Sequence, residues 1–260
     1  MNKTKIDWCD STWNPVTGCL HNCEYCYARS IATRFGNFDV CFDGNTNKVL
    51  SNGCIELGTR QNNPYPAKFT PTLHRYHLED YKNKKTRNIF VCSMADLFGE
   101  WVPNNWLEEV FAACKIANQH NYLFLTKNPS GYKRAISLCN EYYDFLNRLW
   151  FGISLTEMSD RNVVVSFLEN TNDKMNRFLS IEPILEEIDL DVLVKNDKIN
   201  WIIIGAETGN RKDKVVPKRE WIEKILNYCR KKDIPCFMKN SLLDVWGEPL
   251  VREFPLQLQK

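Results

Sequence analysis

The 260-residue sequence lacks the features that would place it in a membrane, in a secretory pathway or on a polyanion through its overall charge. No stretch approaches the roughly 18 consecutive apolar residues of a membrane span, and residues 1–14 lack the apolar core of a signal peptide. The net charge is only +2, and the short basic runs at 82–87 and 230–232 are typical of solvated loops and helix ends. We therefore expect a cytoplasmic globular protein with no membrane partner.

The sequence also lacks internal repeats and low-complexity segments. Instead, short and nearly continuous apolar runs recur along the chain, as expected for strands that are buried on both faces. The predicted strands lie at 88–93, 121–126, 149–154, 177–181, 200–205 and 234–239. Helices are predicted between them, clearly at 104–119 and 216–233 and less clearly at 130–148, 158–171 and 184–195.

Strands that alternate with helices indicate βαβ units and a parallel sheet. A first strand near 12–18 and a helix at 26–35 add one more unit. The resulting six or seven units in one domain over 1–260 are enough for a partial or irregular α/β barrel, and an open doubly wound sheet is the alternative. Residues 36–74 interrupt the pattern with four glycines and three prolines, so we expect a long loop insertion there.

Cysteine is the residue type with the most informative distribution. Of the eleven cysteines, Cys19, Cys23 and Cys26 lie within eight positions in a C-x3-C-x2-C pattern. Because thiols stay reduced in the cytoplasm, we interpret these three as metal ligands and not as part of a disulfide framework. The scattered cysteines are expected to be packing residues and to form no auxiliary cluster; they are Cys92, Cys114, Cys139, Cys229 and Cys236.

Zinc is the main alternative metal that the three cysteines could bind. A structural zinc site takes four ligands, and no second C-x2-C pair follows; the remaining candidates are Cys9, Cys41, Cys54, His74 and His77. An iron–sulfur cluster held by three thiolates fits better, because one iron then keeps an open coordination position. The C-x3-C-x2-C spacing is also the signature of radical S-adenosylmethionine (SAM) enzymes, and here it opens a predicted helix after a predicted strand.

Polar residues follow each predicted strand, at the edge where parallel α/β proteins bind their ligands. In chain order they are Ser93, Asp96, Lys127, Ser154, Glu182, Glu207 and Lys239. The three-cysteine loop follows the first predicted strand, so all of these residues would meet at one rim of the sheet. The pattern predicts a single site at that rim.

Motifs along nearly the whole chain resemble, in order, a phage-associated radical-SAM-like family of unknown function. They are WNPVTGCLHNCEYCYAR, FVCSMADLFGEWVP, LFLTKNP, FGISLTE, FLSIEPIL, WIIIGAETG and FMKN. More distantly, S-x-x-D after the second strand and T-K after the third resemble the spore photoproduct lyase branch of radical SAM proteins. The resemblance implies a partial (β/α)6-type TIM barrel of parallel strands, the radical SAM core.

The resemblance also implies the cofactors and their ligands. Cys19, Cys23 and Cys26 would ligate three irons of a [4Fe–4S] cluster, and the amino and carboxylate groups of SAM would chelate the fourth. The implied SAM contacts are Tyr25 near the adenine, Ser93 and Asp96 at the amino group, Lys127 at the carboxylate, and Ser154 and Glu182 at ribose or carboxylate groups. Glu207, Lys239 and the 36–74 insertion are the candidates for the substrate side.

The implied activity is reductive cleavage of SAM to a 5′-deoxyadenosyl radical, with an electron donor such as flavodoxin or ferredoxin as partner. The lyase-like motifs and the phage association favour a nucleic-acid base or nucleoside as substrate. Two alternatives stay open: a radical SAM enzyme that acts on a small metabolite or peptide, and a non-catalytic zinc-binding protein.

Overall fold

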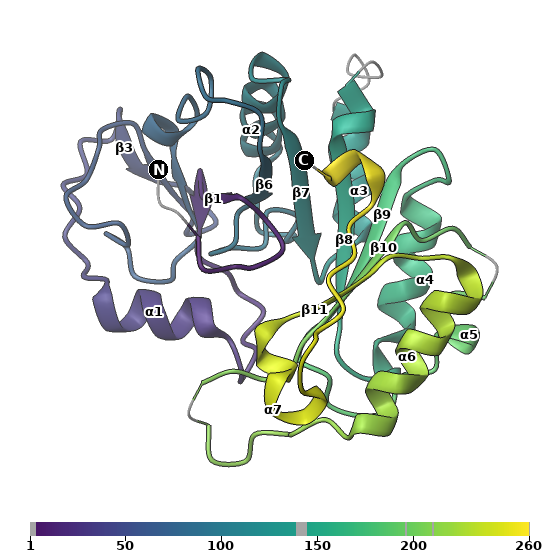
Figure 1. Ribbon diagram of the computed structural model, residues 1–260. Coiled ribbons are helices and arrows are strands. Elements are labelled where there is room, and N and C mark those ends of the chain that lie inside the picture. Colours follow the sequence, from purple (N-terminus) through teal and green to yellow (C-terminus); the bar gives the residue numbers. More distant parts are fainter. Residues whose placement is uncertain (1–3, 139–144, 196, 210, 260) are drawn as a thin grey trace.

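The computed structural model describes residues 4–138, 145–195, 197–209 and 211–259. In this part of the chain, a curled sheet of seven parallel strands forms the body of the protein (Figure 1). The strands, in their order along the sheet, are β1 (Ser11–Trp13), β6 (Asn88–Val91), β7 (Asn121–Thr126), β8 (Leu149–Leu155), β9 (Asn176–Ile181), β10 (Trp201–Ile204) and β11 (Cys236–Met238).

A helix follows each of the first six strands of this sheet. The helices are α1 (Tyr27–Phe35), α2 (Asn104–Ile116), α3 (Ser130–Leu138), α4 (Arg161–Asn170), α5 (Leu190–Leu193) and α6 (Arg219–Lys232). The predicted partial (β/α)6 barrel is therefore confirmed. The doubly wound alternative is wrong, because its strand order reverses at a switch point, whereas the strand order here follows the chain from β1 to β11.

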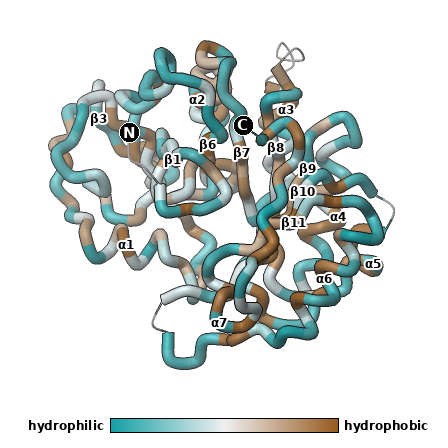
Figure 2. The backbone as a smooth tube through the Cα atoms, in the orientation of Figure 1, coloured by the Kyte–Doolittle hydropathy of each residue, from teal (hydrophilic) through white to brown (hydrophobic). Residues whose placement is uncertain are grey.

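Both faces of the sheet are buried, which explains the nearly continuous apolar runs in the sequence. The outer face packs against the helices in the main hydrophobic core. The inner face carries an aromatic cluster that includes Phe90, Trp150, Phe178 and Trp201, all 7% exposed or less. Figure 2 shows hydrophobic residues concentrated along the strands and hydrophilic residues on the outer loops.

The C-terminal segment closes one end of the curled sheet. It carries α7 (Leu243–Trp246) and the short 3-10 turn Leu256–Leu258, and it runs across the sheet (yellow in Figure 1). Asn88 and Asn121, the first residues of β6 and β7, donate hydrogen bonds to the carbonyls of Leu258 (2.7 Å) and Gln257 (3.0 Å). The N-terminal ends of β6 and β7 are thus covered by the C-terminal segment.

The sequence predicted that segment 36–74 is a long loop, but part of it forms strands. It contains β3 (Asn47–Val49), β4 (Ile55–Leu57) and β5 (Thr72–His74), which join β2 (Val16–Thr17) in a four-stranded sheet of order β2-β5-β4-β3. These strands have only two or three residues each, too few for a periodic pattern to emerge. The predicted first strand at 12–18 divides at Pro15, and its halves enter different sheets.

Other differences from the predicted elements are smaller. The helix predicted at 184–195 reduces to the four residues of α5, and single 3-10 turns form at 75–77, 158–160 and 240–242. Part of the helix predicted at 130–148, with Cys139, lies outside the described residues. The packing role predicted for the scattered cysteines is confirmed for Cys92, Cys114, Cys229 and Cys236, which are 3% exposed or less. None of the described helices combines the length and apolarity needed to cross a bilayer.

Candidate functional site

A cavity of about 440 Å³ opens at the carboxyl ends of the parallel strands. All eleven residues predicted from the sequence line it: Cys19, Cys23, Tyr25, Cys26, Ser93, Asp96, Lys127, Ser154, Glu182, Glu207 and Lys239. Apolar side chains, among them Trp8, Phe90 and Leu125, line the same cavity. The structure thus brings the predicted residues together where parallel α/β proteins bind ligands, while their individual roles stay predictions.

The three-cysteine loop is attached to the barrel at its first residue. Gly18 has φ +84° and pairs in a parallel β-bridge with Ala95, and its N–H donates to the Met94 carbonyl at 2.9 Å. A Cβ at this position would lie 2.2 Å from the Thr70 carbonyl oxygen. Glycine is therefore required here both by backbone conformation and by space.

The three cysteines are free, and each is partly exposed at the cavity. Cys26 caps the N-terminus of α1, and its Sγ accepts a hydrogen bond from the backbone N–H of Arg29 at 3.3 Å. The backbone N–H of His21 donates to Sγ of Cys19 at 3.5 Å. A helix N-terminus favours negative charge, so the position of Cys26 suits a thiolate ligand.

Burial opposes ionisation of two of these thiols. It raises the pKa of Cys19 to about 12 and also raises the pKa of Cys23. Both thiols are therefore protonated at neutral pH until a metal displaces their protons. The affinity of the site for a metal should therefore increase with pH. In the described part of the chain, no group of three or more His, Cys, Asp and Glu side chains is already arranged around a metal position.

Asp96 lies beneath the cysteine loop and is 5% exposed. Its Oδ1 accepts hydrogen bonds from Thr126 Oγ1 (2.6 Å) and the Phe98 N–H (3.0 Å). Its Oδ2 accepts from His21 Nε2 (2.7 Å) and the Lys127 N–H (2.9 Å). A carboxylate offers about four lone-pair sites, so the predicted bond from the SAM amino group would require one of these bonds to break.

Two tyrosines from the cysteine loop and α1 reach the strand ends. Lys127 Nζ donates to the Tyr25 hydroxyl at 2.7 Å and lies 5.3 Å from the centroid of the same ring. Burial lowers the pKa of Lys127, but the hydrogen bond to Tyr25 and the charge interactions with Tyr25, Cys23 and Asp160 together raise it, so the net shift is upward and the ammonium is charged. The Tyr27 hydroxyl donates to the Ser93 carbonyl at 2.7 Å, and Ser93 Oγ donates to Asn14 Oδ1 at 3.1 Å.

The opposite wall of the cavity holds an ion pair between Lys239 Nζ and Glu182 Oε1. Both side chains are partly exposed, at 20% and 24%. Ser154 on β8 lies beside Ser180 on β9 in the strand register, which keeps this part of the inner face small and polar. A Cβ at Gly205 would lie 3.1 Å from both Glu182 Oε1 and Lys239 Cδ, so glycine makes room for the pair.

Glu207 is held by Arg211 in the loop that follows β10. Arg211 donates to both carboxylate oxygens at 2.8 Å, and its Nη1 lies 3.6 Å from Glu24 Oε2 in the cysteine loop. The hydrogen bond from Arg211 lowers the pKa of Glu207, whose side chain is 2% exposed. Glu207 is thus an ionised, paired carboxylate, and its partner links the loop after β10 to the cysteine loop.

Sequence reasoning missed several residues that shape this site. His21 could have been noticed from its position between Cys19 and Cys23. Asp7 carried no signal, because its Oδ2 accepts from the Asn240 N–H (3.0 Å) and from Arg252 Nη1 (2.9 Å), more than 230 residues away. The distance in sequence hides such pairs from any local pattern.

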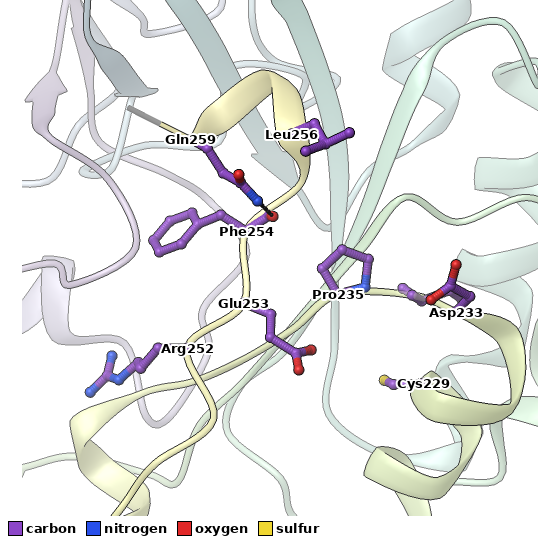
Figure 3. A pocket seen from close by; sticks show the side chains of 9 residues that line it. Cys229, Asp233, Pro235, Arg252, Glu253, Phe254, Leu256 and Gln259 are labelled. Carbon is purple, nitrogen blue, oxygen red and sulfur yellow. Dashed lines mark hydrogen bonds between the residues drawn. The ribbon is translucent and has the colours of Figure 1, made fainter.

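A second cavity, of about 540 Å³, lies between α6 and the C-terminal segment (Figure 3). None of the eleven residues predicted for the functional site lines it. Two of its charged side chains have structural partners: Glu253 Oε2 accepts from the Cys236 N–H at 2.9 Å, and Arg252 pairs with Asp7. The cavity at the carboxyl ends of the strands is therefore the candidate site.

Residues 3–251 match the family described as Protein of unknown function (DUF5131). The chain belongs to that family. No curated protein matches the sequence. Among solved structures, the fold is similar to spore photoproduct lyase complexed with dinucleoside spore photoproduct, with a TM-score of 0.54 and 9% identity over 91% of this chain and 78% of that one. A tyrosine-to-phenylalanine mutant of the lyase gives 0.53 and 10% identity, with the same coverage. At this identity the similarity shows a shared fold.

Proposed function

We propose that this member of the DUF5131 family is a radical SAM enzyme whose Cys19, Cys23 and Cys26 bind a [4Fe–4S] cluster. The observation that carries the proposal is the position of these three free thiols, which line the same cavity as every predicted strand-end residue. The fold supports it as well, because spore photoproduct lyase, which has a similar fold, is a radical SAM enzyme.

The surroundings of the cysteines fit a cluster. Cys19 and Cys26 pack in an apolar group with Ala28, Phe69 and Met94, and both sulfurs accept backbone N–H bonds. Hydrogen bonds to sulfur and low solvent exposure are the means by which proteins set the reduction potential of such clusters. A set of three thiolates leaves one iron for a non-protein ligand, whereas a structural zinc site needs a fourth protein ligand.

When bound, the cluster and SAM would supply radical chemistry: with one electron from a donor such as flavodoxin or ferredoxin, SAM would be cleaved to methionine and a 5′-deoxyadenosyl radical, which would abstract a hydrogen atom from the substrate or add to it. The residues of the chain would bind and orient the cofactors and the substrate and would exclude water from them. Lys127 would neutralise the SAM carboxylate, and Tyr25, the residue proposed to contact the adenine, would keep the Lys127 ammonium in place through its hydroxyl. Ser93 and Ser154 would offer hydroxyl groups to the remaining polar atoms of SAM.

The Glu182–Lys239 pair supports a nucleobase or nucleoside as substrate. Lys239 uses one N–H on Glu182 and keeps two, while Glu182 Oε2 makes no hydrogen bond with another described residue and remains an acceptor. A donor beside an acceptor matches the adjacent C=O and N–H of a nucleobase edge. Trp8 and Phe90 add apolar aromatic surface for a planar ring. Because Glu182 is paired with Lys239, we propose that it contacts the substrate and not SAM.

Anaerobic reconstitution with iron, sulfide, a reductant and SAM tests the proposed chemistry. We expect 5′-deoxyadenosine as a product, and its loss in Cys23→Ala. The matched control is Cys41→Ala, which removes an exposed thiol outside the site and should leave the product unchanged. Zinc at full occupancy with no cleavage of SAM would show instead that the protein is a zinc-binding protein.

A second assay tests the substrate class. Nucleosides and DNA oligonucleotides, each at a stated salt concentration, should bind and increase the release of 5′-deoxyadenosine. Lys239→Met should weaken binding of the best of them about tenfold, because the Glu182 carboxylate then lacks its partner. Stimulation by peptides or small metabolites alone would refute a nucleobase substrate and leave the cluster chemistry intact.

A further inference from the structure

We infer that Asp96 and His21 act as a positioning pair that holds the cysteine loop in the shape that receives the cluster, and that Asp96 does not bind SAM. The inference rests on the proposed function, since it concerns the same three cysteines. It differs from the role that the resemblance implied for Asp96.

The Asp96 carboxylate joins three separate segments. It accepts from its own turn at the Phe98 N–H, from the end of β7 at Thr126 and Lys127, and from the cysteine loop at His21. All four lone-pair sites are therefore used, in a side chain that is 7% exposed. A SAM amino group could bind only by displacing one of these donors, and a displaced buried donor would lose its partner.

His21 is fixed on more than one side. Its ring lies edge-on to Trp101, with centroids 5.0 Å apart at 77°, while Nε2 donates to Asp96 at 2.7 Å. Its backbone N–H donates to the sulfur of Cys19. The ring and the backbone of one residue thus connect a predicted cluster ligand to a buried carboxylate.

The loop around His21 needs such an anchor. Leu20 and Glu24 are 55% and 84% exposed, so these neighbours contribute little packing. Asn22 has φ +51°, a left-handed conformation that is disfavoured for non-glycine residues although asparagine tolerates it better than most. The bond from His21 to Asp96 holds the chain on one side of this turn and thereby orients Cys23 on the other.

Loss of the His21–Asp96 pair should cause a specific defect. Without the pair, the loop keeps its attachments at Gly18 and at α1, but the spacing of Cys19 and Cys23 is no longer fixed. Loss of a residue that orients a metal ligand commonly weakens metal affinity by about 10- to 100-fold. The defect should therefore appear in the cluster, in its amount and its electronic properties, and not in the affinity of a loaded protein for SAM.

The test compares His21→Phe, His21→Gln and Asp96→Asn with the wild type after anaerobic reconstitution. Iron and sulfide per chain, the EPR spectrum and midpoint potential of the reduced cluster, and the dissociation constant of SAM are measured. His21→Phe and Asp96→Asn should lose iron affinity about tenfold or more, with a shifted EPR spectrum in the fraction that stays loaded. His21→Gln keeps an N–H donor and should restore the wild-type spectrum.

His77→Phe is the matched control, because His77 Nδ1 makes a similar 2.8 Å bond to Asp80 away from the cavity. It should match the wild type in every measurement. If the wild type itself assembles no iron–sulfur cluster, the proposed function fails. If the wild type is loaded and both His21→Phe and Asp96→Asn keep its content, spectrum and potential, the positioning pair is refuted. Weaker SAM binding by Asp96→Asn at full cluster content would instead make Asp96 a SAM ligand.

Discussion

The two sheets of this protein are stabilised in different ways. The seven-stranded sheet buries apolar residues on both faces, and most of the polar residues predicted for the site lie at the carboxyl ends of its strands. The four-stranded sheet buries charged and polar side chains within it, including Glu56 at 2% and His74 at 1% exposure. The first sheet therefore depends mainly on buried apolar area, whereas the second, which also buries Ile55, Leu57 and Leu73, depends in addition on specific polar partners.

The partners in the small sheet are well defined. Glu56 accepts hydrogen bonds from Arg75 Nη1 and Trp106 Nε1, both at 2.8 Å, and pairs with Lys48 at 3.1 Å. Because Trp106 belongs to α2, this carboxylate attaches the small sheet to the barrel. A buried carboxylate that is fully paired contributes stability only while all its donors remain.

The largest effect should come from the apolar sheet. Trp150→Ala removes a fully buried side chain from the aromatic inner face and should cost about 3–5 kcal/mol of unfolding free energy. Urea unfolding of metal-free protein, followed by circular dichroism, measures this loss. A cost below about 1 kcal/mol would mean that the inner face can collapse around the space, and that buried area is not what stabilises this sheet.

An intermediate effect is expected in the small sheet. Burial opposes ionisation of Glu56, but the bonds from Arg75, Trp106, Lys48 and Asn105 outweigh it and lower the pKa to about 2, from an ordinary 4.5. Glu56→Gln should cost about 1–3 kcal/mol at pH 7. Since the folded pKa lies below the unfolded one, this contribution is present above pH 4.5 and is lost as the pH falls toward 2.

Urea midpoints of wild type and Glu56→Gln across that pH range provide the check. The two should converge as the pH falls, because only the wild type gains a proton at this position on unfolding. A difference that stays constant from neutral to acid pH would show that the charge of Glu56 is not what the small sheet depends on.

The smallest effect is expected at the surface of the barrel. Lys231 Nζ lies 3.1 Å from Asp191 Oδ1, and the two side chains are 65% and 56% exposed. Lys231→Ala should change the unfolding free energy by no more than about 0.5 kcal/mol, because water and salt screen exposed pairs. A loss as large as that in Glu56→Gln would remove the distinction between buried and exposed charge in this protein.

The same contrast explains what could be predicted from the sequence. The strands of the barrel were recognisable from apolar runs such as 121–126, and the residues after them converge because parallel strands end at one edge. The small sheet could not be predicted, since its strands have two or three residues and join segments far apart, as in the 2.8 Å bond between Thr17 and His74. His21 and Asp7 were missed for a similar reason, because their partners are distant in the chain.

We propose that three cysteines leave one iron of a [4Fe–4S] cluster open to SAM. Pulsed EPR on the reduced, reconstituted protein, with SAM labelled in its amino nitrogen and carboxylate carbon, tests this proposal most directly. We predict magnetic coupling of both labels to the cluster, lost in Cys23→Ala. A reduced cluster whose spectrum does not respond to SAM, or a protein that holds zinc and no cluster, would contradict the account.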